Sequence, residues 1–219
     1  MKPTFACSLA AVLVLAACGE SATLPVAAGT GPSPQLPPPR KTLLPTVHIA
    51  PARGWPAGDK PVPAQGLAVA AYASGLHHPR WLHVLPNGDV LVAESNAPPK
   101  EGSGGIRRWV TKMVMNRAGA GVPSADRITL LRGLNPDGTA QTRSVFVEGL
   151  RSPFGMALVG RDFYVATTEG VVRFDYPEGA LRLDTAPVPV TDLPGGPINH
   201  HWTKSLIASP DGAKLYATV

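Results

Sequence analysis

Short apolar runs separated by turn residues dominate the chain after residue 66. Runs of this length, bounded by Gly, Pro, Asn and Asp, are typical of β-strands, whereas an amphipathic helical pattern is weak and confined to Ile106–Met115. Asn87-Gly88, Asp137-Gly138 and Asp211-Gly212 lie between runs and favour tight hairpins. The pattern predicts an all-β fold with strands at Leu67–Tyr72, Trp81–Leu85, Val90–Ala93, Arg127–Leu131, Val145–Val147, Gly155–Val159, Phe163–Thr167, Val171–Phe174, Val188–Val190, Ser205–Ala208 and Leu215–Val219.

Part of this pattern repeats. Residues 82–93 and 206–217 share apolar residues, a Pro-(Asn/Asp)-Gly turn and a final Ala at the same spacing, and residues 157–166 form a shorter copy. The last two copies end 51 residues apart, and the longer first interval fits a Gly/Pro-rich insertion around Pro98–Pro123. A period of about 50 residues with several strands per unit is typical of a β-propeller blade. A two-sheet sandwich would give similar strands but would not explain the period.

Eleven predicted strands correspond to roughly three blades of four, whereas closed propellers have about four to eight blades. The last predicted strand also runs to Val219. We therefore expect residues 66–219 to be the N-terminal half of a longer β-propeller domain.

The N-terminus predicts an exported lipoprotein. Lys2 precedes an apolar run, Phe5–Ala17, which has the length of a signal peptide rather than a membrane span. The run ends in a segment, residues 15–19, that resembles the bacterial lipobox. We expect cleavage of residues 1–17 and lipidation of Cys18, with Glu20 favouring an outer-membrane anchor facing the periplasm. The alternative is an ordinary signal peptide with a chance cysteine.

Composition predicts a linker and argues against thiol chemistry and nucleic-acid binding. The chain has 25 prolines, and their density in residues 18–65 predicts an extended, semi-rigid linker. Once Cys7 is removed and Cys18 is lipidated, no disulfide or thiolate chemistry remains. The net charge of +5 is mild and the aromatic fraction is 6%. No basic stripe is interleaved with aromatic residues, so nucleic acid is not an expected partner.

Three polar clusters precede the core strand of each repeat unit: His77–Trp81, Leu150–Met156 and Gly195–Lys204. Equivalent positions in successive propeller blades converge at one mouth of the central channel, where ligands bind. A histidine beside Asn199 and Lys204 can act as a general base near neutral pH, although capping a turn or binding a surface metal is the alternative. HExxH, GxSxG and Walker motifs are missing from the sequence.

These clusters resemble the glucose/sorbosone dehydrogenase family, and the nearest branch looks like the L-sorbosone dehydrogenase type. The likeness is carried by residues 199–206 with the turn at 209–212, by residues 76–81 with 87–96, and by residues 149–157. The resemblance implies a six-bladed β-propeller that oxidises an aldose or a sugar aldehyde. It also implies pyrroloquinoline quinone (PQQ) as hydride acceptor and calcium as the ion that helps to bind and polarise it.

The resemblance also implies residue roles. His201, five residues before Leu206, would be the catalytic base for the C1 hydroxyl of the sugar or of an aldehyde hydrate. By their position alone, Arg80 and Arg151 could approach the cofactor's carboxylates, and the alternative is that they are structural arginines at the channel rim. His200 and Lys204 are further cofactor-binding positions. Calcium ligands are expected beyond Val219. His200 stands where family members usually carry an acid, and Trp202 to Lys204 replace small glycines.

Two other functions remain open. A propeller could bind carbohydrate or a protein partner in the periplasm without catalysis. A lactonase-type hydrolase would need calcium ringed by carboxylates and asparagines, and the clusters carry histidine and arginine instead.

Overall fold

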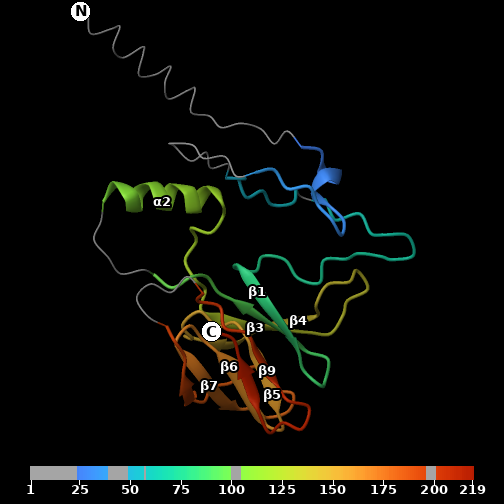
Figure 1. The fold of residues 1–219 in the computed structure, drawn as a ribbon. Helices are drawn as coiled ribbons and strands as arrows, with labels where there is room; N and C mark the ends of the chain where they lie inside the picture. The colour runs from blue at the N-terminus through green and yellow to red at the C-terminus, as the bar shows by residue number, and fades with distance from the viewer. Residues whose placement is uncertain (1–23, 39–48, 57, 100–104, 196–200) are drawn as a thin grey trace, which may run out of the picture. The chain divides into compact units, whose positions relative to one another are not determined.

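The computed structural model (Figure 1) describes residues 24–38, 49–56, 58–99, 105–195 and 201–219. The chain divides into two compact units, Met1–Pro51 and Ala52–Val219. The described part of the first unit contains one 3-10 turn, η1 (Val26–Gly29), and no strand. Cys18 and His200 lie outside the described residues.

The second unit is built mainly from antiparallel β-sheet, which confirms the all-β class. The first sheet has the order β1-β2-β3-β4, the second β5-β6-β7-β8 and the third β10-β9. The strands are β1 (Pro79–Val84), β2 (Val90–Glu94), β3 (Arg127–Arg132), β4 (Thr142–Glu148), β5 (Met156–Val159), β6 (Asp162–Ala166), β7 (Gly170–Asp175), β8 (Val188–Asp192), β9 (Leu206–Ala208) and β10 (Leu215–Ala217). Within each sheet, strands that are adjacent in the chain therefore pair with each other.

One predicted strand is wrong. Leu67–Tyr72 has no ladder partner and is mostly exposed. Its end is held by isolated bonds instead: Ala140 N–H donates to the Tyr72 carbonyl at 2.8 Å, and the Tyr72 hydroxyl donates to the Gly133 carbonyl at 3.0 Å. An apolar run becomes a strand only when a neighbour supplies the paired backbone groups.

The predicted helix is present as α2 (Ile106–Arg117), two residues longer than expected. It lies in the connection between β2 and β3. The helix ends at Ala118 and Gly119, where Gly119 adopts a φ of +74°. A left-handed glycine is a common helix terminator. No helix among the described residues has the length and apolarity needed to cross a bilayer.

Three Pro-(Asn/Asp)-Gly turns form the hairpins β1–β2, β3–β4 and β9–β10. In each turn the Asn or Asp side chain accepts a backbone N–H two residues later, at 3.1 Å for Asn87, 3.0 Å for Asp137 and 3.0 Å for Asp211. The glycine that follows has a φ of +86°, +88° and +70° respectively. These side chains fold the turn locally, as Asx turns do.

Two buried clusters join the sheets. Phe146 of the first sheet meets Phe163 of the second edge to face, with ring centroids 5.5 Å apart, and both are fully buried. A second cluster combines Ala157 and Ala166 of the second sheet with Leu206 of the third. At its edge, Gly155 N–H donates to the Lys204 carbonyl at 3.0 Å. The starts of β5 and β9 therefore lie side by side.

Candidate functional site

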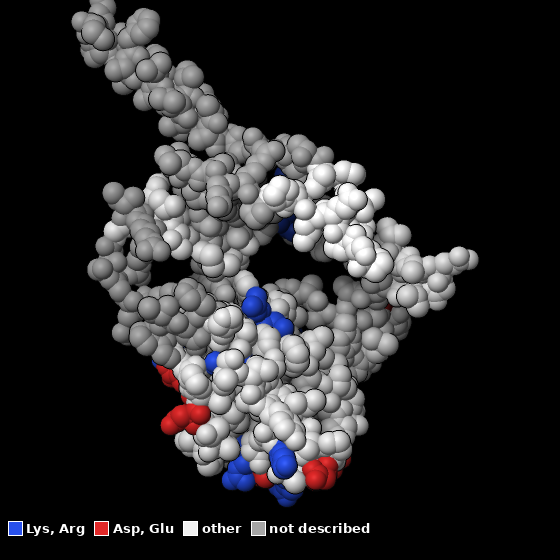
Figure 2. All heavy atoms as spheres, viewed as in Figure 1, with Lys and Arg blue, Asp and Glu red and all other residues white. Residues whose placement is uncertain are grey.

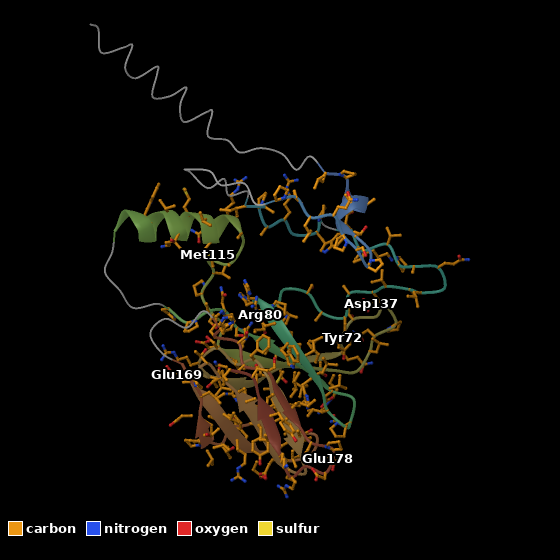
Figure 3. The ribbon with its side chains drawn as sticks, viewed as in Figure 1. Tyr72, Arg80, Met115, Asp137, Glu169 and Glu178 are labelled. Atoms are coloured by element: carbon orange, nitrogen blue, oxygen red, sulfur yellow. The ribbon has the colours of Figure 1, made fainter. Side chains whose placement is uncertain are left out.

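Residues from all three polar clusters meet near the starts of β1, β5 and β9. Trp81 lies 5.1 Å from Phe154, and Phe154 lies 6.5 Å from Trp202, measured between ring centroids. The guanidinium of Arg80 lies 5.1 Å from the Trp202 ring centroid. We call Arg80, Trp81, Phe154 and Trp202 the aromatic row. Figure 3 labels Arg80 near the start of β1, and Figure 2, in the same view, shows basic atoms gathered there.

The aromatic row offers flat apolar faces beside a positive charge. Trp81 is 39% exposed, while Phe154 and Trp202 are half-buried. A guanidinium over a tryptophan is held by the ring quadrupole, which leaves its N–H donors free to turn towards a ligand. The row can therefore stack a flat ring and hold an anionic group beside it.

Lys204 follows Trp202 by two residues in the chain and is only 2% exposed. It precedes Leu206, the first residue of β9, by two residues, and its backbone carbonyl accepts the Gly155 N–H at 3.0 Å. Among the described residues, no acceptor lies within hydrogen-bonding distance of its ammonium group. A buried cation without a partner is unfavourable in the free protein, and an anionic ligand would relieve that cost.

The other predicted site residues are placed differently. His201 is exposed beside Trp202. Arg151 forms an ion pair with Glu169 at 2.5 Å, and both side chains are about half exposed. The Arg151 guanidinium is therefore already paired with a carboxylate of the chain, whereas the Arg80 guanidinium lies over the Trp202 ring. His200 and Asn199 lie outside the described residues.

Glu94 at the end of β2 positions the first cluster, a role that the sequence analysis missed. It is fully buried and accepts two hydrogen bonds from Arg127, both at 3.0 Å, as well as bonds from Thr129 and the His77 N–H. Burial alone would raise the pKa of Glu94, but these hydrogen bonds and the Arg127 charge hold the pKa below its ordinary value. The carboxylate therefore stays ionised and fixes the backbone just before Arg80.

Ser95 and Asn96 connect the end of β2 to the second cluster. The Ser95 hydroxyl donates to the Pro153 carbonyl at 2.6 Å, and the Ser152 hydroxyl donates to the Asn96 carbonyl at 2.7 Å. The Asp126 carboxylate accepts the Ser152 N–H at 3.0 Å. The available signal was three polar residues, Glu94 to Asn96, directly after a wholly apolar strand.

Backbone strain is concentrated in the same region. His78, Asp126 and Ser152 have φ values of +55°, +51° and +49°, and they are the non-glycine residues of the described chain with positive φ. Each such conformation costs about 1–3 kcal/mol and persists only where surrounding contacts enforce it. Strain of this kind is enriched at binding and catalytic sites, which favours a functional role for the clusters.

A groove of about 590 Å³ continues from Trp81 along β1, β5, β9 and β10. Its lining is mostly apolar and includes Met156, Leu206, Ile207 and His83. Burial lowers the pKa of the His83 imidazole, so the ring is neutral at neutral pH. The groove provides an open, mostly apolar surface next to the aromatic row.

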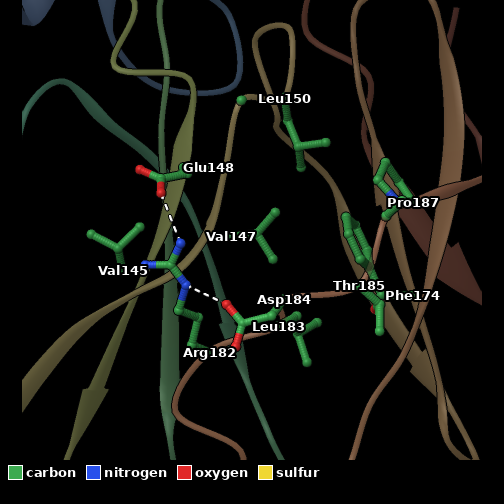
Figure 4. A pocket seen from close by; sticks show the side chains of 12 residues that line it. Val145, Val147, Glu148, Leu150, Phe174, Arg182, Leu183, Asp184, Thr185 and Pro187 are labelled. Carbon is green, nitrogen blue, oxygen red and sulfur yellow. Dashed lines mark hydrogen bonds and ion pairs between the residues drawn. The ribbon is translucent and has the colours of Figure 1, made fainter.

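A second cavity of about 340 Å³ lies between β4 and residues 182–187 (Figure 4). Arg182 crosses it and donates to Glu148 at 3.0 Å and to Asp184 at 2.6 Å. Its charge is thus neutralised within the chain, and the cavity shares only Leu150 with the three clusters. It is a weaker candidate than the aromatic row.

Within the described ranges, no group of three or more His, Cys, Asp or Glu residues is arranged to hold a metal ion. Comparison with protein-family models, curated proteins and solved structures finds no match to this chain. Function therefore has to be inferred from the residues and their geometry.

Proposed function

We propose that the chain is part of a quinoprotein of the glucose/sorbosone dehydrogenase type, which oxidises an aldose or a sugar aldehyde by hydride transfer to PQQ. The observation that carries the proposal is the aromatic row, together with the buried Lys204 two residues after Trp202, which has no partner among the described residues. Three sequence clusters contribute to this one place, and together they supply stacking surfaces and two cations.

The arrangement of the sheets supports a β-propeller as the fold of this protein. Two consecutive four-stranded antiparallel meanders are followed by a third sheet that begins in the same way. The first strands β5 and β9 are adjacent, and the repeated sequence units coincide with the first hairpin of each sheet. Blades of a propeller are meanders that pack through their faces, with first strands at the centre.

The site residues fit the cofactor. PQQ is a flat aromatic ring system that bears carboxylates, and when bound it supplies the hydride acceptor. Trp202 would contact the ring face, while Arg80 and Lys204 would bind carboxylates through charge-assisted hydrogen bonds. Arg151 would need to leave Glu169 before it could take such a role. We assign no described residue to calcium.

His201 would act on the substrate. Its imidazole is exposed beside Trp202, where it can accept the proton of the C1 hydroxyl as the hydride leaves C1. Trp81 and Phe154 would cover the sugar ring and exclude water from it. A correctly placed general base contributes about 10²–10⁴-fold to the rate.

The test measures PQQ binding and dye reduction separately. We expect the complete protein, of which this chain is the proposed N-terminal half, to bind PQQ, as followed by tryptophan quenching, and to reduce a dye with an aldose or an aldehyde. Arg80→Ala should weaken PQQ binding roughly 10- to 100-fold, because one charge-assisted hydrogen bond is lost. Trp109→Ala changes a tryptophan outside the site and is the matched control. Failure to bind PQQ, or equal binding by Arg80→Ala, would contradict the proposal.

His201→Ala separates catalysis from binding. We expect PQQ binding to be retained while dye reduction falls by about 10²–10⁴-fold. Unchanged turnover would refute the role of His201.

The aromatic row also favours a second function, the non-catalytic binding of carbohydrate. Trp81, Phe154 and Trp202 form a succession of ring faces of the kind that stacks on sugars. Saturable binding of an oligosaccharide, lost in Trp202→Ala and accompanied by no dye reduction with any aldose or aldehyde, would favour this function.

We further propose that the protein is anchored on the periplasmic side of the outer membrane through lipid on Cys18. Cells grown with a labelled fatty acid should label the chain, and Cys18→Ala should abolish the label. An unlabelled wild-type chain would contradict the anchor.

A further inference from the structure

Helix α2 is unusual in its charge. Its twelve residues include Arg107, Arg108, Lys112 and Arg117 and no acidic residue. It interrupts the β2–β3 connection, whereas the corresponding connection in the second sheet, residues 167–169, is a short turn. The chain therefore carries a basic helix that the sheets themselves do not require.

The helix also exposes apolar side chains. Trp109, Val110 and Met113 are 65%, 41% and 52% exposed, and their spacing places them on one side of the helix. No strand in the described chain packs along α2. Figure 1 shows the helix apart from the sheets, and Figure 2 shows visible acidic side chains over the sheets and their loops rather than over α2.

The C-terminal end of α2 is fixed to the protein. Asn96 donates its side-chain amide to the Ala120 and Val122 carbonyls at 3.1 and 2.6 Å. The His78 imidazole Nε2 lies 3.2 Å from the Gly119 carbonyl. The C-terminal end of the helix is therefore tied to Asn96, just after β2, and to His78, two residues before Arg80.

We propose that α2 lies in the interfacial region of an anionic lipid bilayer, with Trp109, Val110 and Met113 inserted among the lipids. A helix with an exposed apolar side that contains tryptophan, cationic residues and no acid has the composition of interfacial membrane helices. Charge decides between possible occupants, because a basic helix is attracted to anionic headgroups and is repelled by a second copy of itself. The proposal does not depend on the dehydrogenase activity.

The test places an environment-sensitive fluorophore on α2 in the full chain. Cys7→Ser and Cys18→Ser remove the native thiols and the lipidation site, and Met113→Cys provides the label position. The matched control carries the label at Leu134→Cys, an apolar residue that is 64% exposed in the β3–β4 connection. The local signal is needed because residues 5–17 could themselves attach the chain to vesicles.

Vesicles of phosphatidylglycerol and phosphatidylcholine should blue-shift the label at residue 113 but not the label at residue 134. High salt should reverse the shift, since it screens the attraction. Lys112→Glu reverses one charge on the helix and should weaken vesicle affinity roughly tenfold or more.

Three outcomes would overturn the proposal. The first is no shift at residue 113 when the protein sediments with anionic vesicles. The second is an equal shift with pure phosphatidylcholine. The third is an apolar environment at residue 113 without vesicles, which would mean that the chain itself covers the helix or, if it depends on concentration, that a second copy does.

Discussion

At the scale of single residues, two buried charged side chains differ in whether they have hydrogen-bond partners. Glu94 is surrounded by donors, including Arg127, so its burial is compensated. Lys204 is almost as deeply buried without a partner among the described residues. The first arrangement contributes to stability, and the second is expected where stability is given up for binding.

Glu94→Gln should lower the free energy of unfolding by about 1.5–3 kcal/mol at neutral pH, because hydrogen bonds to a charged acceptor are lost. The pKa of Glu94 in the folded state lies below its ordinary value of 4.5. Its contribution is therefore present above that pH and disappears as the pH falls through the folded-state pKa. Urea unfolding at neutral and acidic pH measures both effects.

Glu169→Gln is the matched control for that prediction. Its partner Arg151 and Glu169 itself are about half exposed, so the change should alter stability by less than about 1 kcal/mol. If both variants lose the same stability at neutral pH, the buried network around Glu94 does not have the importance assigned to it.

Lys204→Met should keep the protein folded and raise its free energy of unfolding by about 1 kcal/mol or more, because an apolar side chain of similar length replaces an uncompensated buried charge. The same variant should lose PQQ binding. Urea unfolding and tryptophan quenching measure the two effects. A large loss of stability would show that the ammonium group has a structural partner.

At the scale of elements, the contact between β5 and β9 depends on Gly155. A Cβ atom at this position would lie 2.3 Å from the Leu206 nitrogen and 2.7 Å from the Lys204 oxygen, both of them backbone atoms. The close approach joins the second cluster to the third. Any side chain at residue 155 must push the two strands apart.

Gly155→Ala should therefore lower the free energy of unfolding by about 1–3 kcal/mol and displace the segment that carries Trp202 and Lys204. Gly54→Ala is the control, since nothing lies within 4 Å of its added Cβ. Urea unfolding measures the loss of stability. Equal stability of the two variants would contradict the close contact.

The elements themselves were largely predictable from the sequence, because alternation and Asx-Gly turns act over a few residues. Ten predicted strands and the α2 region correspond to observed elements, whereas Leu67–Tyr72 failed because pairing depends on a distant partner. The candidate site was likewise predictable only where it depends on residues close together in the sequence. The clusters were visible, but the Arg151–Glu169 pair and the support from Glu94 arise from contacts between residues far apart in the chain.

At the scale of the whole molecule, the first two sheets share one core. Leu85, Leu91 and Phe146 pack with Phe163 and Phe174 in a single buried cluster. Arg132 adds a polar connection, since it binds Asp89 and also donates to the Gly179 carbonyl at 3.0 Å. The two sheets are therefore expected to unfold together.

Phe146→Ala should lower the free energy of unfolding by about 3–5 kcal/mol, because the variant leaves a cavity between the sheets. Amide hydrogen exchange should show β2, β3, β6 and β7 losing protection together. Leu134→Ala, at an exposed position, should change little. Loss of protection in the first sheet alone would mean that the sheets are independent.

The turn at Asn87-Gly88 also determines how the protein ages chemically. Asn-Gly pairs deamidate when the glycine nitrogen attacks the side-chain amide. In the folded turn that N–H is bound to the Leu85 carbonyl at 2.9 Å, and the Asn87 amide donates to Asp89 at 2.8 Å. Unfolding releases the Gly88 N–H and the Asn87 amide. Deamidation would then convert Asn87 to a carboxylate, which would repel Asp89 instead of donating a hydrogen bond to it. Each unfolding event thus allows Asn87 to deamidate, and the deamidated chain refolds less well. The rate at which stored protein is lost therefore depends on how rarely this hairpin opens.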